Sequence, residues 1–314
     1  MTKPSRRRWV GRILSIALFS GAAWMLAAEL RHHPLPALLA ALRAIPPLRI
    51  GVSLVATALG YTALTGYDLL SLRYLGRRIP GRTVAFASFI GFAFANSLPF
   101  SLVTGASVRY RLYSDRGLSV ADTTQLVALN TVTYVVGLLA TAGVAFALQP
   151  ILVPGFLRLP LHTARPLGVL CLLVVAAYLG WSAIGREPIR LGKWRLPAPN
   201  LPRAAAQVLV SGLDWTLSGT ALYLLLPSGL DFTTFLGVFL LGQIAALVAQ
   251  VPGGLGVFEA VVLWWLKPAV QPPAIFSALA AYRVIYFLLP LAIASVLWGG
   301  REARRWVRRR RHPA

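Results

Sequence analysis

Acidic side chains are scarce in this sequence, so each one inside an apolar stretch is a candidate for function. The chain has 314 residues, with nine Asp and Glu against 31 Lys and Arg. Glu259 follows a glycine-rich segment, and Asp214 lies in the middle of the stretch LVSGLDWTLSG. An ionisable side chain within a membrane is costly and marks a functional site by default. We predict that Glu259 and Asp214 face a polar cavity, the alternative being structural pairing, whereas Asp68, near the end of its apolar stretch, is typical of an interfacial residue.

Two helix-breaking segments lie close to these charges. One is PGGLG at residues 252–256, which contains Gly253, Gly254 and Gly256; the other is NSLP at residues 96–99, which begins with Asn96. Irregular backbone at membrane depth is tolerated only where it is buried in protein or lines a wet cavity. Both segments are therefore predicted to border a substrate-binding site. The alternative for the glycines is that they only permit close packing of helices.

Arginines near these breaks supply the opposite charge. Arg109 and Arg111 follow the NSLP break, in GASVRYRLYSDRG. A guanidinium binds phosphate or carboxylate in a bidentate manner, so a phospholipid head group is the expected anion, and membrane anchoring is the alternative. Arg283 lies between Tyr282 and Tyr286 in the last apolar stretch. Its depth predicts an ion pair with Glu259 or with Asp214.

Enzyme signatures are weak in this sequence. All four histidines fall in predicted loops or in the tail, so no base is available inside the membrane for a Ser-His protease. The sequence has no HExxH motif, no Walker motif and no Cys/His cluster. The single cysteine, Cys171, is expected to be a packing residue. We therefore expect no enzymatic activity, no catalytic residues, no metal and no cofactor.

Composition indicates an integral membrane protein. Hydrophobic residues make up 57% of the chain, charged residues 13%, and the mean hydropathy is +0.68. An ordinary soluble domain has about 25% charged residues. The net charge of +22 comes from arginines between and beside apolar stretches. This pattern favours contact with the anionic cytoplasmic leaflet over binding of nucleic acid.

Hydropathy predicts an all-α fold, a polytopic transmembrane helix bundle. Apolar stretches run over residues 10–28, 50–70, 84–103, 123–148, 166–184, 204–226, 232–251, 255–266 and 275–298. The first is expected to be an uncleaved span, because no clean signal-peptide cleavage site follows it. Leucines spaced at i, i+3, i+4 and i+7 from Leu35 predict a short amphipathic helix on the membrane surface.

The arginines also predict topology. Short cytoplasmic loops collect basic residues, so both termini are expected in the cytoplasm. A full crossing by residues 84–103 would put the following arginines outside, so we predict a re-entrant hairpin there. The segment at 232–266 has few basic residues beside it and is predicted to open toward the outside. About six full spans remain, and two opposed broken hairpins resemble the inverted repeats of secondary transporters, a symmetry that rests on hydropathy and charge alone.

The whole of residues 1–314 is thus expected to form one integral membrane domain. A first half at 10–148 contains the re-entrant segment near 84–108. A second half at 166–298 contains the broken segment near 232–266, and a basic cytoplasmic tail follows at 299–314. The expected location is the bacterial inner (plasma) membrane.

The two broken elements, PGGLGVFEA and NSLPFSLVTGASVRYRLY, resemble the transmembrane region of the lysylphosphatidylglycerol synthase/flippase family. The resemblance covers about residues 50–298 and implies a membrane region that moves an aminoacylated phospholipid between leaflets. It marks Gly253, Gly254, Gly256 and Glu259, and more loosely Gly105 and Arg109. The soluble domain that makes the lipid in that family has no room after Trp298, so this chain is not expected to be an aminoacyltransferase.

The leading hypothesis is a lipid translocase, or flippase-like transporter, that handles a polar phospholipid head group. Glu259 would attract a cationic group, and Arg109 would hold phosphate in the same cavity. The alternative is a non-catalytic membrane partner of a lipid- or glycan-modifying enzyme. A membrane-embedded lipid-modifying enzyme is the weakest of the three hypotheses.

Overall fold

The computed structural model describes residues 35–98, 101–149, 151–153, 162–184, 189–191, 194–196, 199–227, 229–249 and 256–311. The first predicted span at 10–28 lies outside the described residues, as do Gly253 and Gly254. Within the described part, four helical segments are long and apolar enough to cross a membrane. They run over Pro47–Tyr74, Val120–Leu148, Arg165–Ile184 and Pro272–Arg304.

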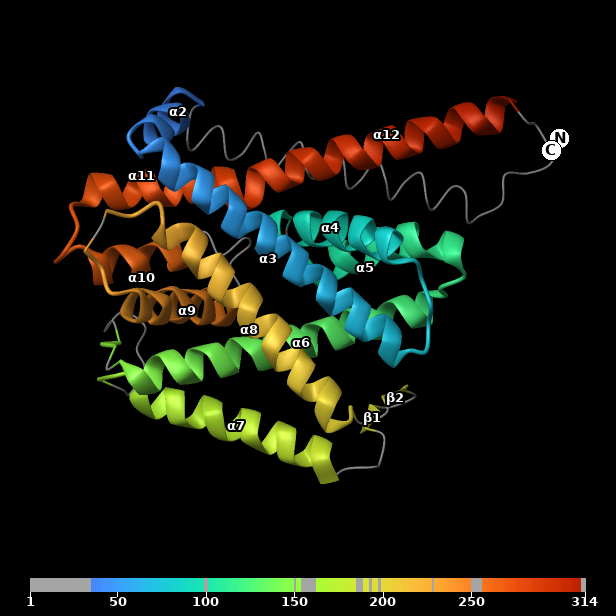
Figure 1. The fold of residues 1–314 in the computed structure, drawn as a ribbon, viewed down its shortest axis with the longest axis horizontal. Helices are drawn as coiled ribbons and strands as arrows, with labels where there is room; N and C mark the ends of the chain where they lie inside the picture. Colours follow the sequence, from blue (N-terminus) through green and yellow to red (C-terminus); the bar gives the residue numbers. More distant parts are fainter. Residues whose placement is uncertain are drawn as a thin grey trace.

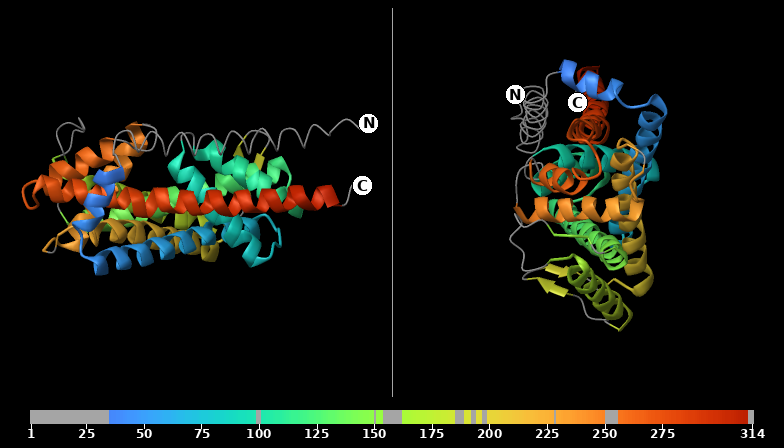
Figure 2. Two further views of the ribbon diagram at one scale, coloured as in Figure 1. Left: turned by 90° about the horizontal axis from the view of Figure 1, so that it is seen from above. Right: turned by 90° about the vertical axis from the view of Figure 1, so that its left-hand side faces the viewer.

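A bundle of long helices forms the body of the molecule (Figure 1). Its members are α3 (Pro47–Tyr74), α6 (Val120–Leu148), α7 (Arg165–Ile184), α8 (Leu201–Tyr223) and a continuous run of α11 (Pro272–Tyr282), η4 (Arg283–Leu288) and α12 (Leu289–Arg311). The helix α8 packs against α3 on one side and α6 on another, and α6 also packs against α7. The predicted multi-pass helical fold is confirmed. Figure 2 shows α12 extending along much of the length of the molecule.

A shorter pair of helices follows α3. The helix α4 (Gly81–Ser97) ends within the NSLP segment, and α5 (Ser101–Tyr113) returns along it. Leu98 leaves the helical conformation with φ −104° and ψ 150°, as expected for a residue that precedes a proline. Both helices have fewer than the roughly 20 residues that a full crossing needs. They therefore form a helical hairpin, while its re-entrant insertion in the membrane stays a prediction.

A second short pair lies in the other half of the chain. The helices α9 (Phe232–Ala249) and α10 (Val257–Leu266) pack against each other, with the glycine-rich segment between them. In Figure 1, this pair opens toward the left end of the bundle, whereas the α4–α5 hairpin opens toward the right end. The two pairs thus point in opposite directions along the bundle, while their entry from opposite membrane sides and the inverted repeat stay predictions.

The last long helical segment contains a π-helix, η4, which was not predicted. In an α-helix the carbonyl of Tyr286 would accept a hydrogen bond from the backbone N–H of residue 290, but Pro290 has none. The Tyr61 hydroxyl of α3 donates to this carbonyl at 3.2 Å instead. The Ser97 hydroxyl of α4 donates to the neighbouring Phe287 carbonyl at 3.4 Å. The π-helix therefore exposes carbonyls that bind it to α3 and α4.

Smaller elements lie at the two ends of the bundle. A helix, α2 (Leu35–Arg43), is present at the predicted position, while its place on the membrane surface stays a prediction. A two-stranded antiparallel hairpin, β1 (Ile189–Leu191) with β2 (Trp194–Leu196), was not predicted. It lies near the start of α8, at the end of the bundle where α3 ends, α4 begins and α12 ends (Figure 1). Arginines are frequent where α3 and α12 end and where α4 and α8 begin. The positive-inside rule predicts such an enrichment on the cytoplasmic side of a membrane protein. The described arginines of this end include Arg73, Arg77, Arg78, Arg82, Arg116, Arg203, Arg301 and Arg304.

Candidate functional site

The second helix break positions Glu259. Gly256 precedes α10 with φ +87°, a left-handed conformation that a residue with a side chain rarely adopts. Glu259 is the third residue of α10, and its Oε2 accepts a hydrogen bond from the Gly256 backbone N–H at 2.8 Å. The amino end of a helix favours a negative charge at this point. The glycine thus turns the chain so that the carboxylate caps the helix.

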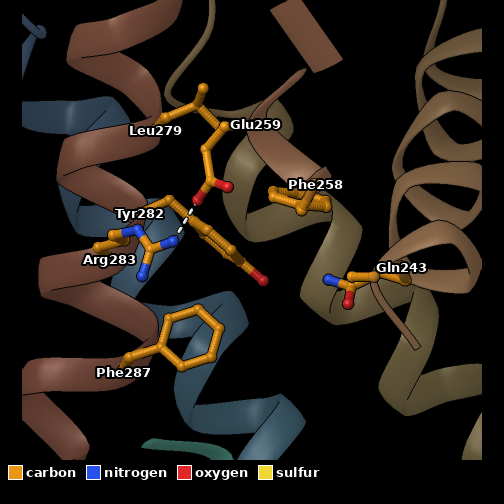
Figure 3. A pocket seen from close by; sticks show the side chains of 8 residues that line it. Gln243, Phe258, Glu259, Leu279, Tyr282, Arg283 and Phe287 are labelled. Carbon is orange, nitrogen blue, oxygen red and sulfur yellow. Dashed lines mark hydrogen bonds and ion pairs between the residues drawn. The ribbon is translucent and has the colours of Figure 1, made fainter. Parts of the chain in front are cut away.

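Arg283 of the π-helix donates to the other oxygen of this carboxylate, Oε1. Glu259 was one of the two partners predicted for Arg283. Their side chains are 24% and 13% exposed, so neither charge is sealed in the protein. Figure 3 shows the two side chains directed toward each other across the gap between α10 and the π-helix.

The pair borders a recess of about 380 Å³, a volume that includes its open mouth. Aromatic and aliphatic side chains form most of the wall, and the amide of Gln243 adds a further polar group (Figure 3). The remaining lining residues are Ala246, Phe258, Leu279, Tyr282 and Phe287. The rings of Tyr282 and Tyr286 stack with centroids 5.1 Å apart, which supports this wall from behind. The recess therefore offers an anion, a cation and an aromatic surface side by side.

Arg109 lies in a different environment, and the sequence interpretation of its partner Asp68 was wrong. Asp68 is fully buried, not interfacial, and Arg109 is only 3% exposed. The Arg109 Nε lies 3.0 and 3.1 Å from the two carboxylate oxygens of Asp68. Asp68 also accepts hydrogen bonds from the Tyr113 hydroxyl at 2.8 Å and from the Asn130 amide at 2.6 Å. This network joins α3, α5 and α6 in the protein interior.

Glycines make room for the Arg109 guanidinium. A Cβ atom on Gly91 would lie 3.1 Å from its Cζ, and one on Gly105 would lie 3.0 Å from its Nη1. The ring of Phe92 lies under the guanidinium, with 4.3 Å from Cζ to the ring centroid. Gly105, which the family resemblance marks, therefore has a packing role beside Arg109.

The other predicted site residues lie apart from the recess. Asp214 is buried on α8 and accepts a hydrogen bond from the Tyr67 hydroxyl at 2.9 Å. Arg111 forms an ion pair with Glu302 of α12 at 2.8 Å. The side chain of Asn96 lies within hydrogen-bonding reach of the Tyr61 hydroxyl.

The structure thus brings Glu259, Arg283 and Gly256 together but gives Arg109 and Glu259 different partners. The residues described as lining the recess do not include Arg109, so the predicted shared cavity finds no support. The described part of the chain also contains no group of three or more His, Cys, Asp or Glu side chains that could hold a metal ion. Sequence reasoning missed Asp68, although a buried Arg109 requires a carboxylate partner and few carboxylates are available.

Most of the chain is similar in sequence to known membrane proteins. Residues 12–294 match the profile of the family described as lysylphosphatidylglycerol synthase TM region. The uncharacterized protein slr0712 of Synechocystis sp. is 36% identical over 285 residues, which cover 90% of this chain and 88% of that protein. The inner membrane protein YbhN of Escherichia coli K12 is 33% identical over 234 residues, covering 74% of this chain and 73% of YbhN.

A shorter match links the chain to larger proteins. The phosphatidylglycerol lysyltransferase of Staphylococcus xylosus is 38% identical over 93 residues, which cover 28% of this chain and 11% of that protein. The long matches point to the same family as the motifs around the two helix breaks. This multi-pass membrane protein therefore belongs to the lysylphosphatidylglycerol synthase transmembrane-region family.

Proposed function

We propose that the chain is a membrane lipid translocase, a flippase-like transporter, whose recess receives a polar phospholipid head group. The observation that carries this proposal is the Glu259–Arg283 ion pair at the edge of an open, aromatic-walled recess. Ionisable side chains in an apolar helical segment are costly, so their presence marks a candidate functional site. The break between α9 and α10 and the π-helix give the pair its position beside the recess.

A head group with both an anion and a cation suits this recess. Arg283 can donate two parallel hydrogen bonds to a phosphate, and Glu259 can pair with an ammonium group. In the absence of lipid, Glu259 and Arg283 pair with each other. A dipolar head group replaces this ion pair by two others, one between Arg283 and phosphate and one between Glu259 and ammonium. No charge is left without a partner during this exchange, which avoids the several kcal/mol that an isolated buried charge costs.

This proposal gives the chain no aminoacyltransferase activity of its own. Its partner is a membrane phospholipid, and its location is the bacterial inner membrane with both termini in the cytoplasm. The inner membrane location is supported by the similarity to YbhN. The cytoplasmic termini are supported by the arginines at one end of the bundle.

The direct test uses purified protein in liposomes that carry a fluorescent aminophospholipid. A membrane-impermeant quencher added outside measures how fast lipid moves from the inner leaflet. We expect wild-type protein to accelerate this movement and Glu259→Gln to reduce the acceleration at least tenfold.

Glu302→Gln is the matched control, because Glu302 is also 24% exposed and is also paired with an arginine, but lies on α12 away from the recess. It should move lipid at the wild-type rate. Equal rates for wild type and Glu259→Gln would contradict the proposal.

The alternative function, a non-catalytic partner of a lipid- or glycan-modifying enzyme, has one observation in its favour. The apolar window of α7 is only 22% buried, against 39 to 44% for the other three long spans. A weakly covered span can receive another membrane protein as well as lipid. Loss of an enzyme activity from membranes that lack this chain, with no lipid movement by the purified chain, would favour this function.

A further inference from the structure

Asp214 differs from Asp68 and Glu259 because no cation among the described residues forms an ion pair with it. Its residue is 4% exposed, and Oδ2 accepts the hydrogen bond from Tyr67. Its Oδ1 is buried and has no hydrogen-bond partner among the described residues. The described ion pairs do not include Asp214. A carboxylate in this setting requires a proton or a bound cation, because an isolated charge is too costly in the interior.

Among the described residues, the titratable groups that interact electrostatically with Asp214 come from α3, α6 and the α11–η4 segment, and all are phenols. Neither α7 nor α9, which also pack against α8, brings a described titratable group to it. The phenols belong to Tyr61, Tyr67, Tyr134, Tyr282 and Tyr286. Of these phenols, Tyr67 donates a hydrogen bond to Asp214, and none of the five carries a positive charge that would neutralise the carboxylate.

A hydrogen-bonded chain beside Asp214 can run in two directions. The Tyr67 hydroxyl lies 2.7 Å from the Ser211 hydroxyl, which lies 3.5 Å from the Tyr134 carbonyl. A phenol has one proton, so it can donate to only one neighbour at a time. When Asp214 is ionised, Ser211 donates to Tyr67 and Tyr67 donates to the carboxylate. When Asp214 is protonated, the carboxyl group donates to Tyr67, Tyr67 to Ser211, and Ser211 to the carbonyl.

Polar side chains continue along the same face of α8 in both directions. Gln207, Ser211, Asp214 and Ser218 recur at i, i+4, i+7 and i+11, and all are buried. Gln207 lies toward the start of α8, at the end of the bundle where the arginines are frequent. At the other end of the stripe, the Ser218 hydroxyl lies 2.5 Å from the Tyr286 hydroxyl. Tyr286 stacks on Tyr282, which lines the recess.

We infer that Asp214 binds and releases one proton in each transport cycle and so couples lipid movement to a proton gradient. The carboxylate takes the proton from water through the Gln207 end of the stripe and becomes a neutral carboxyl group. It returns the proton to water on the opposite side of the membrane, through the Ser218–Tyr286 end of the stripe, so the protein is unchanged and one proton has crossed. The coupling rests on the proposed function, whereas the binding of a proton by Asp214 can be measured without it.

The first experiment is an infrared pH titration of the purified chain in lipid nanodiscs. As pH falls, the carboxyl groups of the chain become protonated, and one of their infrared bands is expected to belong to Asp214. This band should be missing from Asp214→Asn and remain in Glu259→Gln. Tyr67→Phe removes the hydrogen bond that stabilises the ionised form, so its titration midpoint should move up by about one to two pH units. Tyr67→Phe keeps the carboxyl group, so it also tests the assignment if Asp214→Asn folds poorly.

A carboxyl band that is identical in wild type and Asp214→Asn would overturn the inference. So would a midpoint that moves with sodium concentration, which would identify a cation site instead. In the liposome assay, an imposed pH gradient should change the wild-type rate at least threefold and leave the Asp214→Asn rate unchanged. If the wild type moves no lipid at all, the proposed function fails, while the infrared titration still decides proton binding. If it moves lipid without responding to the gradient, the coupling is wrong.

Discussion

Two ion pairs among the described residues, Asp68–Arg109 and Glu259–Arg283, differ in how accessible they are. Asp68 and Arg109 are 0% and 3% exposed, and two further side chains donate hydrogen bonds to the carboxylate. Glu259 and Arg283 are 24% and 13% exposed and border an open recess. The first pair is enclosed by glycines and an aromatic ring. The second lies where a helix begins and where another helix is locally unwound.

This difference predicts a structural role for the first pair and, under the proposed function, a ligand-binding role for the second. A buried pair whose partners are fixed is strongly destabilised when one member is removed, because the other charge stays behind without a partner. A partly exposed pair contributes little to stability and can exchange its partner for a ligand. The contacts of Arg109 favour a structural role, and its binding of phosphate stays a prediction that these contacts do not support.

The largest expected effect concerns the enclosed pair. Asp68→Asn should lower the free energy of unfolding by about 3 to 5 kcal/mol, because Arg109 loses its counter-ion in the interior. Thermal unfolding of the purified protein in detergent measures this change. Arg109→Gln should have an effect of the same size. Wild-type stability in both variants would remove the distinction between the two pairs.

A smaller effect is expected from crowding the same guanidinium. Gly105→Ala places a methyl group 3.0 Å from Nη1 of Arg109, in a helical position where the guanidinium has little room to move. Overpacking of this kind costs about 1 to 3 kcal/mol. Gly180→Ala on α7 is the control, since its Cβ would meet nothing within 4 Å. Equal melting temperatures for the two variants would show that Gly105 has no packing role.

A hydrogen bond links the helix of the enclosed pair to the π-helix of the open pair, and removing it should have a smaller effect. Tyr61 of α3, the helix that carries Asp68, donates to the Tyr286 carbonyl in the π-helix that carries Arg283. Tyr61→Phe removes this hydrogen bond and should reduce stability by about 0.5 to 1.5 kcal/mol. Combined with Asp68→Asn in a double-mutant cycle, it measures the coupling between the regions. An additive result would mean that the two pairs are energetically independent.

The smallest effect on stability is expected for the open pair. Glu259→Gln should change the free energy of unfolding by about 0 to 1 kcal/mol, although under the proposed function it reduces lipid movement at least tenfold. Glu302→Gln should show the same small change and retain transport. A loss of several kcal/mol in Glu259→Gln alone would make this pair structural as well, and its effect on transport would lose its meaning.

Hydropathy predicted most of the fold because each span is a nearly continuous run of apolar residues. The break after Ser97 and the start of α10 near Gly256 followed from proline and glycine chemistry. The π-helix was missed although Pro290 lies within the last apolar run, since a proline there can equally produce a kink. The β1–β2 hairpin was missed because its strands have only three residues each.

The site was predicted less completely than the fold. Glu259 and Arg283 were recognised because a charge stands out in an apolar stretch, and their pairing followed from depth. Asp68 was missed because its position near the end of an apolar stretch resembles an interfacial one. Side chains from α5 and α6 surround it in the folded molecule, and such tertiary contacts have no local signal in the sequence.

The π-helix gives the last long helix one extra residue in a turn, which offers a way to change its register. An α-helix advances by about 100° of rotation per residue, since it has 3.6 residues per turn. If the extra residue of the π-helix passed along the helix, the residues that it passed would turn by about that angle relative to α12. Arg283 begins the π-helix, so such a step would rotate its guanidinium around the helix axis while α12 kept its contacts with α4. A transport cycle could then alternate the exposure of one charge by a local screw motion, without moving whole domains.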